Sequence, residues 1–152
     1  MPFVYILRHA KAQKHAETDH ARQLSEKGER QALTLATWLV QSGIDFDQVI
    51  VSDSARTLET LELLELETQI SVVKKAYNAD SRTLSELIRE SGAQDSVLVI
   101  AHNPGVSDVC HQAGHTSELR TCELVILDCS VSLSEFSPEK CEIAGFYRPE
   151  VD

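Results

Sequence analysis

Two arginines and two histidines in this sequence each follow a short apolar run, and their side chains are suited to phosphate chemistry. Arg8 and His9 come directly after one run. Arg56 lies just beyond a second run, and His102 follows a third. If the runs are parallel strands, side chains at their carboxyl ends gather in one cleft. Guanidinium groups match phosphate oxygens in two-point contacts, and imidazole acts as a nucleophile or proton carrier near neutral pH. The pattern therefore predicts a site for a phosphoryl group.

Each of these side chains also has an ordinary structural interpretation. A histidine at a strand end, such as His102, is often only a hydrogen-bonded structural residue. Arg22 taken alone fits a solvated loop charge, and Tyr77 and Asn78 either line the cleft or simply pack. The remaining histidines are interpreted as surface or structural residues: His15, His20, His111 and His115. A functional assignment therefore depends on several of these residues lying together.

The elements that must position these residues are visible as strand and helix patterns. Short apolar runs rich in β-branched residues indicate strands at residues 3–7, 47–52, 70–73, 96–101, 122–127 and 143–147. A spacing near 3.6 residues predicts a first helix, with Ser25 as its N-cap and Gly43 as its stop. Further helices are expected after residue 54, over about 80–90 and after residue 103. Asn103 is the expected cap of the last one, with Pro104 in its first turn.

Strands that alternate with helices predict a mostly parallel sheet with helices on both faces. The last two strands have no helix between them, so they predict an antiparallel edge. The expected fold class is α/β, a three-layer sandwich with a mostly parallel central sheet and an antiparallel edge. A length of 152 residues fits a single domain that covers residues 1–152.

Composition and charge argue against several broad classes of protein. With 14 Lys+Arg against 24 Asp+Glu the formal net charge is −10, and no polybasic run favours nucleic acid as a partner. No apolar run approaches the roughly 20 residues of a membrane span. The N-terminal apolar stretch is also too short for a secretory signal. We therefore expect a cytoplasmic monomer that binds neither nucleic acid nor membranes.

The cysteines indicate buried free thiols. They include no CxxC pair: Cys110, Cys122, Cys129 and Cys141. Within the cluster of Cys110, His111, His115 and Cys122, the two histidines stand at i and i+4. The spacing of this cluster matches no common zinc pattern, so a metal site is not expected there.

Four motifs resemble those of the histidine phosphatase superfamily, which has the phosphoglycerate-mutase-like fold. The resemblance spans nearly the whole chain and includes the Arg-His dipeptide that follows the first strand in that family. The matching segments are Leu7-Arg8-His9-Ala10, Arg22-Gln23-Leu24-Ser25-Glu26-Lys27-Gly28, Ser52-Asp53-Ser54-Ala55-Arg56-Thr57-Leu58-Glu59-Thr60 and His102-Asn103-Pro104-Gly105. Each is a weak signal alone, but four in the right order at the expected strand ends are specific.

The resemblance implies a role for each matched residue. His9 would attack phosphorus and carry the phosphoryl group as a covalent intermediate. Arg8, Arg56 and His102 would hold the phosphoryl oxygens, with His9 neutral and His102 protonated. Further contacts with the substrate are expected from Arg22, Tyr77 and Asn103. Because arginines supply the charge that a metal otherwise provides, this mechanism implies neither a metal nor an organic cofactor.

The region after the third predicted strand narrows the choice within the family. It has no room for the helical insertions of larger members, so the pocket is expected to be open to a side chain from another protein. Small-molecule members place a carboxylic acid here, whereas this chain has Ala76-Tyr77-Asn78-Ala79-Asp80. Asp80 fits better as a helix cap. A phosphorylated imidazole leaves as neutral imidazole and needs no such acid.

The Tyr77-Asn78-Ala79 segment and the His102-Asn103-Pro104-Gly105 motif resemble the short bacterial SixA-type phosphohistidine phosphatases. The implied function is hydrolysis of phosphohistidine on phosphorelay or phosphocarrier proteins. Residues 8–22 carry a net charge of +2 that would guide such a partner, from Arg8, Lys11, Lys14 and Arg22 against Glu17 and Asp19. Two alternatives stay open: a small-molecule phosphomonoesterase of the same superfamily, and a non-catalytic phosphate-binding module.

Overall fold

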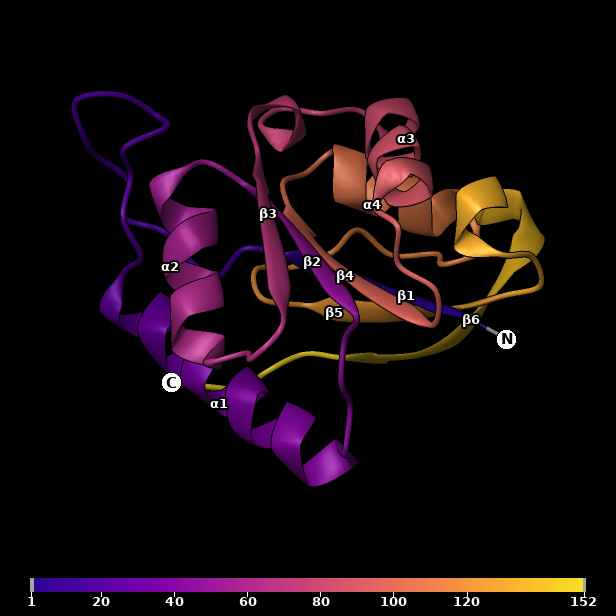
Figure 1. Cartoon of the computed structure of the whole chain (residues 1–152). Coiled ribbons are helices and arrows are strands. Elements are labelled where there is room, and N and C mark those ends of the chain that lie inside the picture. Colours follow the sequence, from indigo (N-terminus) through magenta and orange to yellow (C-terminus); the bar gives the residue numbers. More distant parts are fainter. Residues whose placement is uncertain (1, 152) are drawn as a thin grey trace.

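Six strands pair into one mixed sheet in the computed structural model, which describes residues 2–151 (Figure 1). The strands are β1 (Phe3–Arg8), β2 (Gln48–Ser52), β3 (Gln69–Val73), β4 (Ser96–Ala101), β5 (Leu124–Cys129) and β6 (Cys141–Tyr147). Their order across the sheet is β3-β2-β4-β1-β5-β6. β1, β2, β3 and β4 run parallel, while β5 is antiparallel to both β1 and β6. The predicted mostly parallel sheet with an antiparallel edge is confirmed.

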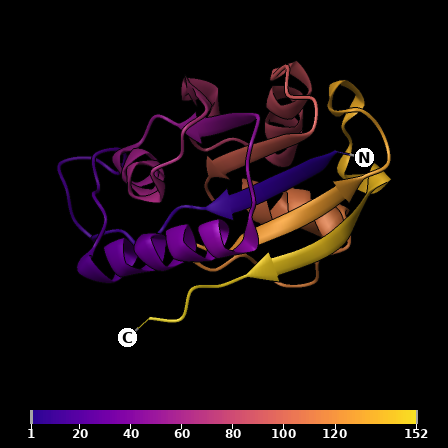
Figure 2. The same cartoon turned by 60° about the horizontal axis from the view of Figure 1, so that its bottom comes forward.

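Helices cover both faces of the sheet (Figure 2). They are α1 (Glu26–Ser42), α2 (Ala55–Leu64), α3 (Ser81–Glu90) and α4 (Gly105–Gln112), with short 3₁₀ turns η1 (Lys74–Ala76), η2 (Leu133–Glu135) and η3 (Pro138–Lys140). Side chains alternate along β1, so Tyr5 and Leu7 pack with α1 and α2, whereas Val4 and Ile6 pack with α3 and α4. Two apolar cores therefore sandwich the sheet, as the predicted three layers require.

Local signals in the sequence fix where the helices begin and end. The Ser25 hydroxyl accepts a hydrogen bond from the backbone N–H of Gly28, and the Asp80 carboxylate accepts one from Thr83. Gly43 ends α1 with a φ of 66°, in the left-handed region that favours glycine. The predicted caps at Ser25 and Asp80 and the stop at Gly43 are confirmed.

Three local predictions are wrong, and one of them is the start of the last strand, which begins at Cys141 instead of residue 143. Asn103 does not cap α4, because its amide donates to the carbonyl of Leu119 and its side-chain oxygen accepts from Ser107. Pro104 is the N-cap residue instead. The strand predicted to begin at Cys122 begins two residues later, because Cys122 has a φ of 59° and its N–H turns back to the carbonyls of Arg8 and His9.

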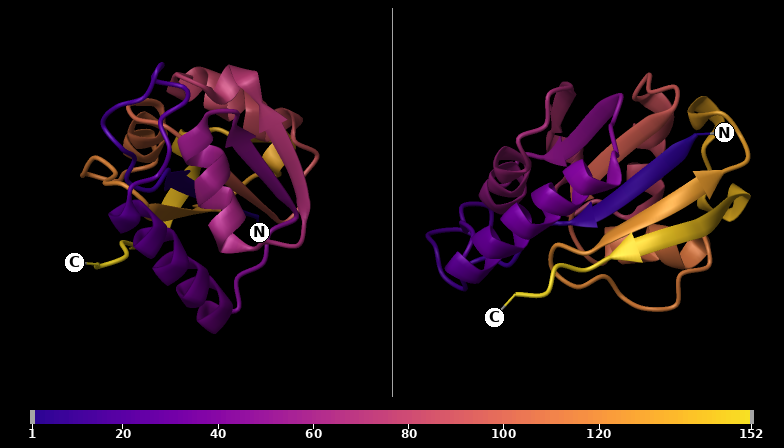
Figure 3. Two further views of the ribbon diagram at one scale, coloured as in Figure 1. Left: turned by 90° about the vertical axis from the view of Figure 1, so that its left-hand side faces the viewer. Right: turned by 90° about the horizontal axis from the view of Figure 1, so that it is seen from below.

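The elements that matter for the site meet at one edge of the sheet. Figure 3 shows the sheet from two further directions, with α1 lying along one face. The carboxyl ends of β1, β2 and β4 point to the same side, since these strands are parallel. Within residues 2–151, no helix has the length and apolar character needed to cross a membrane.

Candidate active site

The predicted convergence of arginines and histidines occurs at the carboxyl edge of the sheet. Arg8 is the last residue of β1, and its register partner in the neighbouring strand β4 is Ala101. His9 and His102 each follow one of these two residues, so their rings lie 5.3 Å apart between centroids. Arg56 reaches the same place from the first turn of α2. The parallel register therefore explains why residues distant in sequence meet.

The His9 ring is held in one orientation by hydrogen bonds at both nitrogens. Its Nδ1 lies 2.7 Å from the Ala10 carbonyl oxygen and donates a hydrogen bond to it. Its Nε2 accepts from Nε of Arg56 at 3.3 Å, so Nε2 carries the lone pair. Burial of the ring, together with the nearby His102, Arg56 and Arg8, lowers the pKa of His9 to about 3. His9 is therefore neutral at pH 7, with a nucleophilic nitrogen facing Arg56.

Arg56 is the centre of the polar cluster. Its side chain is almost fully buried, and its donors reach His9, His102 and Asp19. The Nη2 atom of Arg56 lies 3.2 Å from Nδ1 of His102 and 3.1 Å from the Asp19 carboxylate. The Asp19 backbone carbonyl also accepts from Nη1 at 2.8 Å. A guanidinium that is fixed in this way presents its fork to an anion at a constant position.

His102 is oriented by a serine at the end of β2. Its Nε2 donates to the Ser52 hydroxyl at 2.8 Å, which leaves Nδ1 facing Arg56. Burial and the Arg56 charge lower the pKa of His102 to about 4. Both rings are therefore neutral at pH 7, and the expectation of a protonated His102 beside a neutral His9 is not met. The causes are the burial of the His102 ring and, second, the positive charge of Arg56 beside it.

Arg8 carries a polar atom that has no partner within residues 2–151. Its Nη1 donates to the Leu119 carbonyl at 3.1 Å, but its buried Nε has no hydrogen-bond acceptor. Burial also lowers the pKa of Arg8. A buried donor left unpaired costs about 1–3 kcal/mol. An oxyanion placed between Arg8 and Arg56 would remove that cost.

Asp19 is the main site residue that sequence reasoning missed. Its carboxylate accepts hydrogen bonds from Tyr77, Arg56 and Arg22. The Tyr77 hydroxyl is the largest cause that lowers the pKa of Asp19, to about 2, and the two arginines add to it. From sequence, Asp19 contributes only to the net charge of residues 8–22. An acid three residues before the loop arginine is the one local signal that could have singled it out.

The loop that carries Asp19 is tied across the site. Its His20 ring hydrogen-bonds Asp53 at 2.9 Å and packs edge-on against Tyr77, with 4.8 Å between ring centroids. His20, predicted to be a surface or structural residue, therefore anchors the loop.

Three predicted substrate contacts occupy different places. Tyr77 lies in the cluster, with its ring edge-on to His102 at 5.4 Å between centroids. Arg22 donates from Nε to the Asp19 carboxylate at 3.1 Å and from Nη1 to the Gln13 carbonyl. These hydrogen bonds go to neither His9 nor His102. The hydrogen-bonding atoms of the Asn103 side chain are used by Leu119 and Ser107. Of these three side chains, only that of Tyr77 packs against the ring of His102.

The segment that carries Tyr77 is held by a close approach between its backbone and that of α4. An added Cβ at Gly105 would lie 2.1 Å from the Ala79 carbonyl oxygen, so α4 can pack against this segment only with glycine there. No helical insertion follows β3, since η1 is the one element between β3 and α3. The expected open pocket is nevertheless wrong in one respect. Asp19 and Tyr77 close over Arg56, and His9 and His102 are only 5% and 4% exposed.

Two buried hydroxyls behind the cluster were also missed. Ser52 holds His102, and the Thr60 hydroxyl accepts from the N–H of Ala10 while donating to the carbonyl of Arg56. Thr60 therefore links the chain after His9 to the helix that carries Arg56. Polar residues at the end of a buried strand and on the inner face of a helix are the signal for such positions.

The cysteines and metal-ligand candidates lie outside this cluster. All four cysteines are buried free thiols, as predicted. Across residues 2–151 no three His, Cys, Asp or Glu side chains are grouped so that they could hold a metal ion. The arrangement at the carboxyl edge instead offers a neutral imidazole, two guanidinium groups and a second imidazole. These groups can bind a phosphoryl group and accept it on nitrogen.

Comparison with known proteins finds similar phosphatases. The sequence profile of the Histidine phosphatase superfamily (branch 1) matches residues 4–77. The phosphohistidine phosphatase SixA of Escherichia coli (strain K12) is 30% identical over 145 residues, which cover 87% of this chain and 86% of that protein. The matched profile therefore includes the segments of His9 and Arg56, and the similarity to the relative extends over most of the chain.

Solved structures resemble the whole fold. A protein from Agrobacterium tumefaciens that carries the name SixA has a TM-score of 0.87 at 26% identity, covering 98% of this chain and 99% of that one. The structure of the protein histidine phosphatase SixA complexed with tungstate has a TM-score of 0.83 at 23% identity, covering 97% of each chain. The latter likeness concerns the fold alone.

Proposed function

This chain belongs to the histidine phosphatase superfamily and is a phosphatase, and from this premise we propose that it hydrolyses phosphohistidine on a protein. The proposal assigns the attack on phosphorus to His9, and the binding of the phosphoryl oxygens to Arg8, Arg56 and His102. It rests on the neutral His9 ring, whose lone pair faces the buried guanidinium of Arg56. Arg22 and Tyr77 act through Asp19, and Asn103 acts through the Leu119 carbonyl that Arg8 also contacts.

The first step transfers the phosphoryl group between two imidazoles. The Nε2 lone pair of His9 forms a bond to phosphorus while the phosphorus–nitrogen bond of the substrate breaks. A phosphorylated imidazole is protonated near neutral pH, so its electron pair returns to a ring that leaves neutral. Water then attacks phosphorus while the phosphorus–nitrogen bond to His9 breaks; its electron pair returns to the His9 ring, which becomes neutral, and inorganic phosphate is released. Fixed donors such as those of Arg8 and Arg56 stabilise the charge that develops on the oxygens.

Binding of the phosphoryl group requires a rearrangement of charge around Arg56. Without substrate, the Asp19 carboxylate accepts a hydrogen bond from Nη2 of Arg56. An incoming phosphoryl oxygen therefore competes with Asp19 for this donor. Phosphate also brings negative charge to Nδ1 of His102, which raises the pKa of that ring. His102 then takes up a proton and donates a hydrogen bond. The unequal protonation of the two histidines thus arises on substrate binding.

The observation that carries the choice of substrate is the protonation of the carboxyl groups at the site. Asp19 has a pKa of about 2 and is ionised at pH 7. Asp80 accepts the backbone N–H of Thr83 as a helix cap, and this contact lowers its pKa. Neither is suited to protonate an alkoxide leaving group. A phosphohistidine substrate needs no such proton from the enzyme.

A cavity near the site supports a protein as the carrier of that phosphohistidine. It has a volume of about 620 Å³, and its lining includes Lys27, Arg120 and Arg148 together with one acid, Glu150. The cavity also contains Gln31, whose side chain accepts from the N–H of Lys11. A cationic surface on a chain of net charge −10 attracts an acidic partner protein to this side.

The test compares release of phosphate from a phosphohistidine-bearing protein domain and from an alkyl phosphate monoester, whose alkoxide leaving group needs a proton, with EDTA present. We expect fast release from the domain, slow release from the ester, and neither in His9→Ala. Faster hydrolysis of the ester would move the assignment to a small-molecule phosphomonoesterase. Phosphate binding without turnover of either substrate would identify a binding module.

A charge reversal separates a protein substrate from a small one. We expect Lys27→Glu/Arg148→Glu to lower kcat/KM about tenfold at low salt for the phosphohistidine domain, as loss of electrostatic steering predicts. The rate with free phosphohistidine should not change. Lys140→Glu, at the opposite end of β6 from Arg148, is the control for a reversed charge outside the cavity. Equal losses with both substrates would contradict a docking role for the cavity.

A further inference from the structure

Cys129 and Cys141 face each other at the edge of the sheet opposite to the histidines. They are direct register partners in the antiparallel pair of β5 and β6. The N–H of Ser130 donates to the carbonyl of Lys140 at 3.1 Å, so the ladder hydrogen bond flanks the cysteine pair. The cysteines therefore form a non-hydrogen-bonded pair, the type in which opposite Cα atoms and side chains lie closest.

The two thiols are in contact. Their Sγ atoms lie 2.7 Å apart, and both residues are free cysteines. A disulfide needs Cα atoms about 4.4–6.8 Å apart, and the non-hydrogen-bonded position provides about 4.5 Å. Bond formation therefore requires only a small adjustment of the two side chains.

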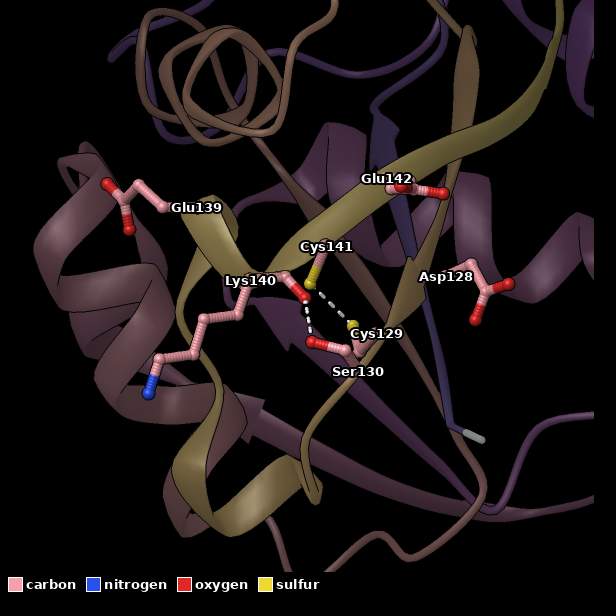
Figure 4. Close-up of a pocket in the computed structure, with 7 residues that line it drawn as sticks. All are labelled: Asp128, Cys129, Ser130, Glu139, Lys140, Cys141 and Glu142. Atoms are coloured by element: carbon pink, nitrogen blue, oxygen red, sulfur yellow. Dashed lines mark hydrogen bonds between the residues drawn. The ribbon is translucent and has the colours of Figure 1, made fainter.

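The pair is also reachable by a small oxidant. Both cysteines line a surface cavity of about 380 Å³, shown with its lining residues in Figure 4. Figure 4 shows both sulfur atoms between the two strands, joined by the dashed contact. Cys141 is 7% exposed and Cys129 is 1% exposed. The cavity admits a molecule the size of a hydroperoxide to the Cys141 side of the pair.

The surroundings favour one thiol as the first to react. The hydrogen bond with Cys129 lowers the pKa of Cys141, and the same contact raises the pKa of Cys129. Burial and the negative charges of Asp128 and Glu139 act against ionisation of Cys141. Lys140 also lines the cavity. Elsewhere, burial raises the pKa of Cys110, and it raises that of Cys122 to about 12, so these thiols serve as internal controls.

We propose that Cys129 and Cys141 are a reversible disulfide site that a hydroperoxide oxidises. The Cys141 thiolate attacks one peroxide oxygen, the oxygen–oxygen bond breaks, and sulfenic acid and water form after proton uptake. The Cys129 sulfur then attacks the Cys141 sulfur. The sulfur–sulfur bond forms, and the hydroxyl group leaves as water with the Cys129 proton. Two thiols lose two electrons, the peroxide gains them, and a thiol reductant reverses the reaction.

The disulfide would covalently join β5 to β6, so the segment between the two strands would become a closed loop. That segment contains η2, η3 and the buried ring of Phe136. Cys129 donates its N–H to the carbonyl of Pro2, at the start of β1, whereas His9 follows the end of β1. The modification is therefore separated from the catalytic cluster by the length of the sheet. We expect greater thermal stability and an unchanged phosphatase rate.

The experiment treats the full chain with hydrogen peroxide and maps the thiols by mass spectrometry. We expect a mass lower by two hydrogen atoms, a Cys129–Cys141 linked peptide, alkylation of Cys110 and Cys122 only, and full recovery with dithiothreitol. The Tm should rise by about 5 °C on oxidation. Four free thiols after treatment, or a different pairing, would overturn the proposal.

Two variants check the order of the steps. Cys129→Ser should trap added oxygen on Cys141 and should show no rise in Tm on oxidation. Cys110→Ser, the matched control, should still form the disulfide and show the full rise. If circular dichroism shows that a variant is poorly folded, peptide mapping of the oxidised wild-type chain still shows whether Cys129 and Cys141 form the disulfide. A rise in Tm of the oxidised Cys129→Ser chain would contradict the proposed cause.

Discussion

The interior of the sheet and its carboxyl edge are equally buried but differ in what they contribute. All six residues of β4 are buried, and four of them are Val, Leu or Ile that pack into the two cores. One residue beyond β4, His102 is just as buried and belongs to a cluster of polar groups. Burial of apolar side chains stabilises the fold. Burial of imidazole and guanidinium groups costs free energy and supplies chemistry.

The contrast teaches where this chain gives up stability for function. Two neutral imidazoles, a buried guanidinium and the unpaired Nε of Arg8 lie together at the edge. One half-exposed carboxylate, that of Asp19, forms an ion pair with the buried guanidinium of Arg56. Substitutions at the edge should therefore remove activity without unfolding the protein, whereas substitutions inside the sheet should do the reverse.

After His9→Ala, which should abolish turnover, Arg56→Met should have the largest effect on activity. We expect kcat/KM for the phosphohistidine domain to fall by about 10²–10³, the loss typical for one fixed donor. The free energy of unfolding in urea should change by less than about 2 kcal/mol, because the lost hydrogen bonds to His9, His102 and Asp19 are offset by the removal of a buried charge. Arg89→Met is the control, since Arg89 contacts the Phe136 carbonyl away from the site. A parallel loss of stability and activity in Arg56→Met would break the comparison.

Leu98→Ala should show the opposite pattern. Leu98 is fully buried in the middle of β4, so the substitution should lower the free energy of unfolding by about 2–5 kcal/mol. Below its melting transition, the variant should keep kcat/KM within about twofold of wild type, since the cavity lies away from the reacting groups. Urea unfolding and steady-state rates measure both quantities. A large loss of activity in a folded variant would show that the interior and the edge are coupled.

Low pH should destabilise the fold through the two site histidines. Their pKa values of about 3 and about 4 lie below the roughly 6.5 of an unfolded histidine, so the unfolded chain binds more protons between these values. Their contribution is complete above pH ~6.5 and is lost as pH falls, by about 2 kcal/mol for His9 between pH 7 and pH 5. Urea unfolding at the two pH values should show this loss in wild type and a smaller one in His9→Asn/His102→Asn. An equal loss in both would place the titrating groups elsewhere.

Asp19→Asn should have the smallest effect and should favour phosphate binding. The Asp19 carboxylate competes with phosphate for Arg56, and its side chain is 53% exposed. Its removal should lower the inhibition constant of inorganic phosphate about threefold, because a half-exposed ion pair contributes up to about 1 kcal/mol. Asp45→Asn is the control for a lost surface charge. Weaker phosphate binding in Asp19→Asn would show that Asp19 positions Arg56 instead of competing for it.

The sheet and the histidine–arginine cluster could be predicted from sequence because their signals are local. The apolar run at 96–101 predicts a buried strand, and the parallel sheet then brings His9 and His102 together. Ser25 and Asp80 were predictable as caps because a cap bonds a backbone group only two or three residues ahead.

The contacts of Asp19 and Asn103 could not be predicted in this way. Asp19 bonds Arg56 and Tyr77, which lie far along the chain, and no periodic pattern records such pairs. The local sequence predicts Asn103 as a helix cap, yet its side-chain amide donates to the carbonyl of Leu119. Side chains that close a site through long-range hydrogen bonds depend on the folded arrangement of loops.

The most direct test of this account is the identification of the phosphorylated residue during turnover. The enzyme is mixed with a radiolabelled phosphohistidine domain, quenched in alkali within the first turnover, and digested for peptide mapping. We predict label on Nε2 of His9 in wild type and no label in His9→Ala. Phosphate release from the domain without labelled His9, or at the same rate in His9→Ala, would contradict the central role of His9.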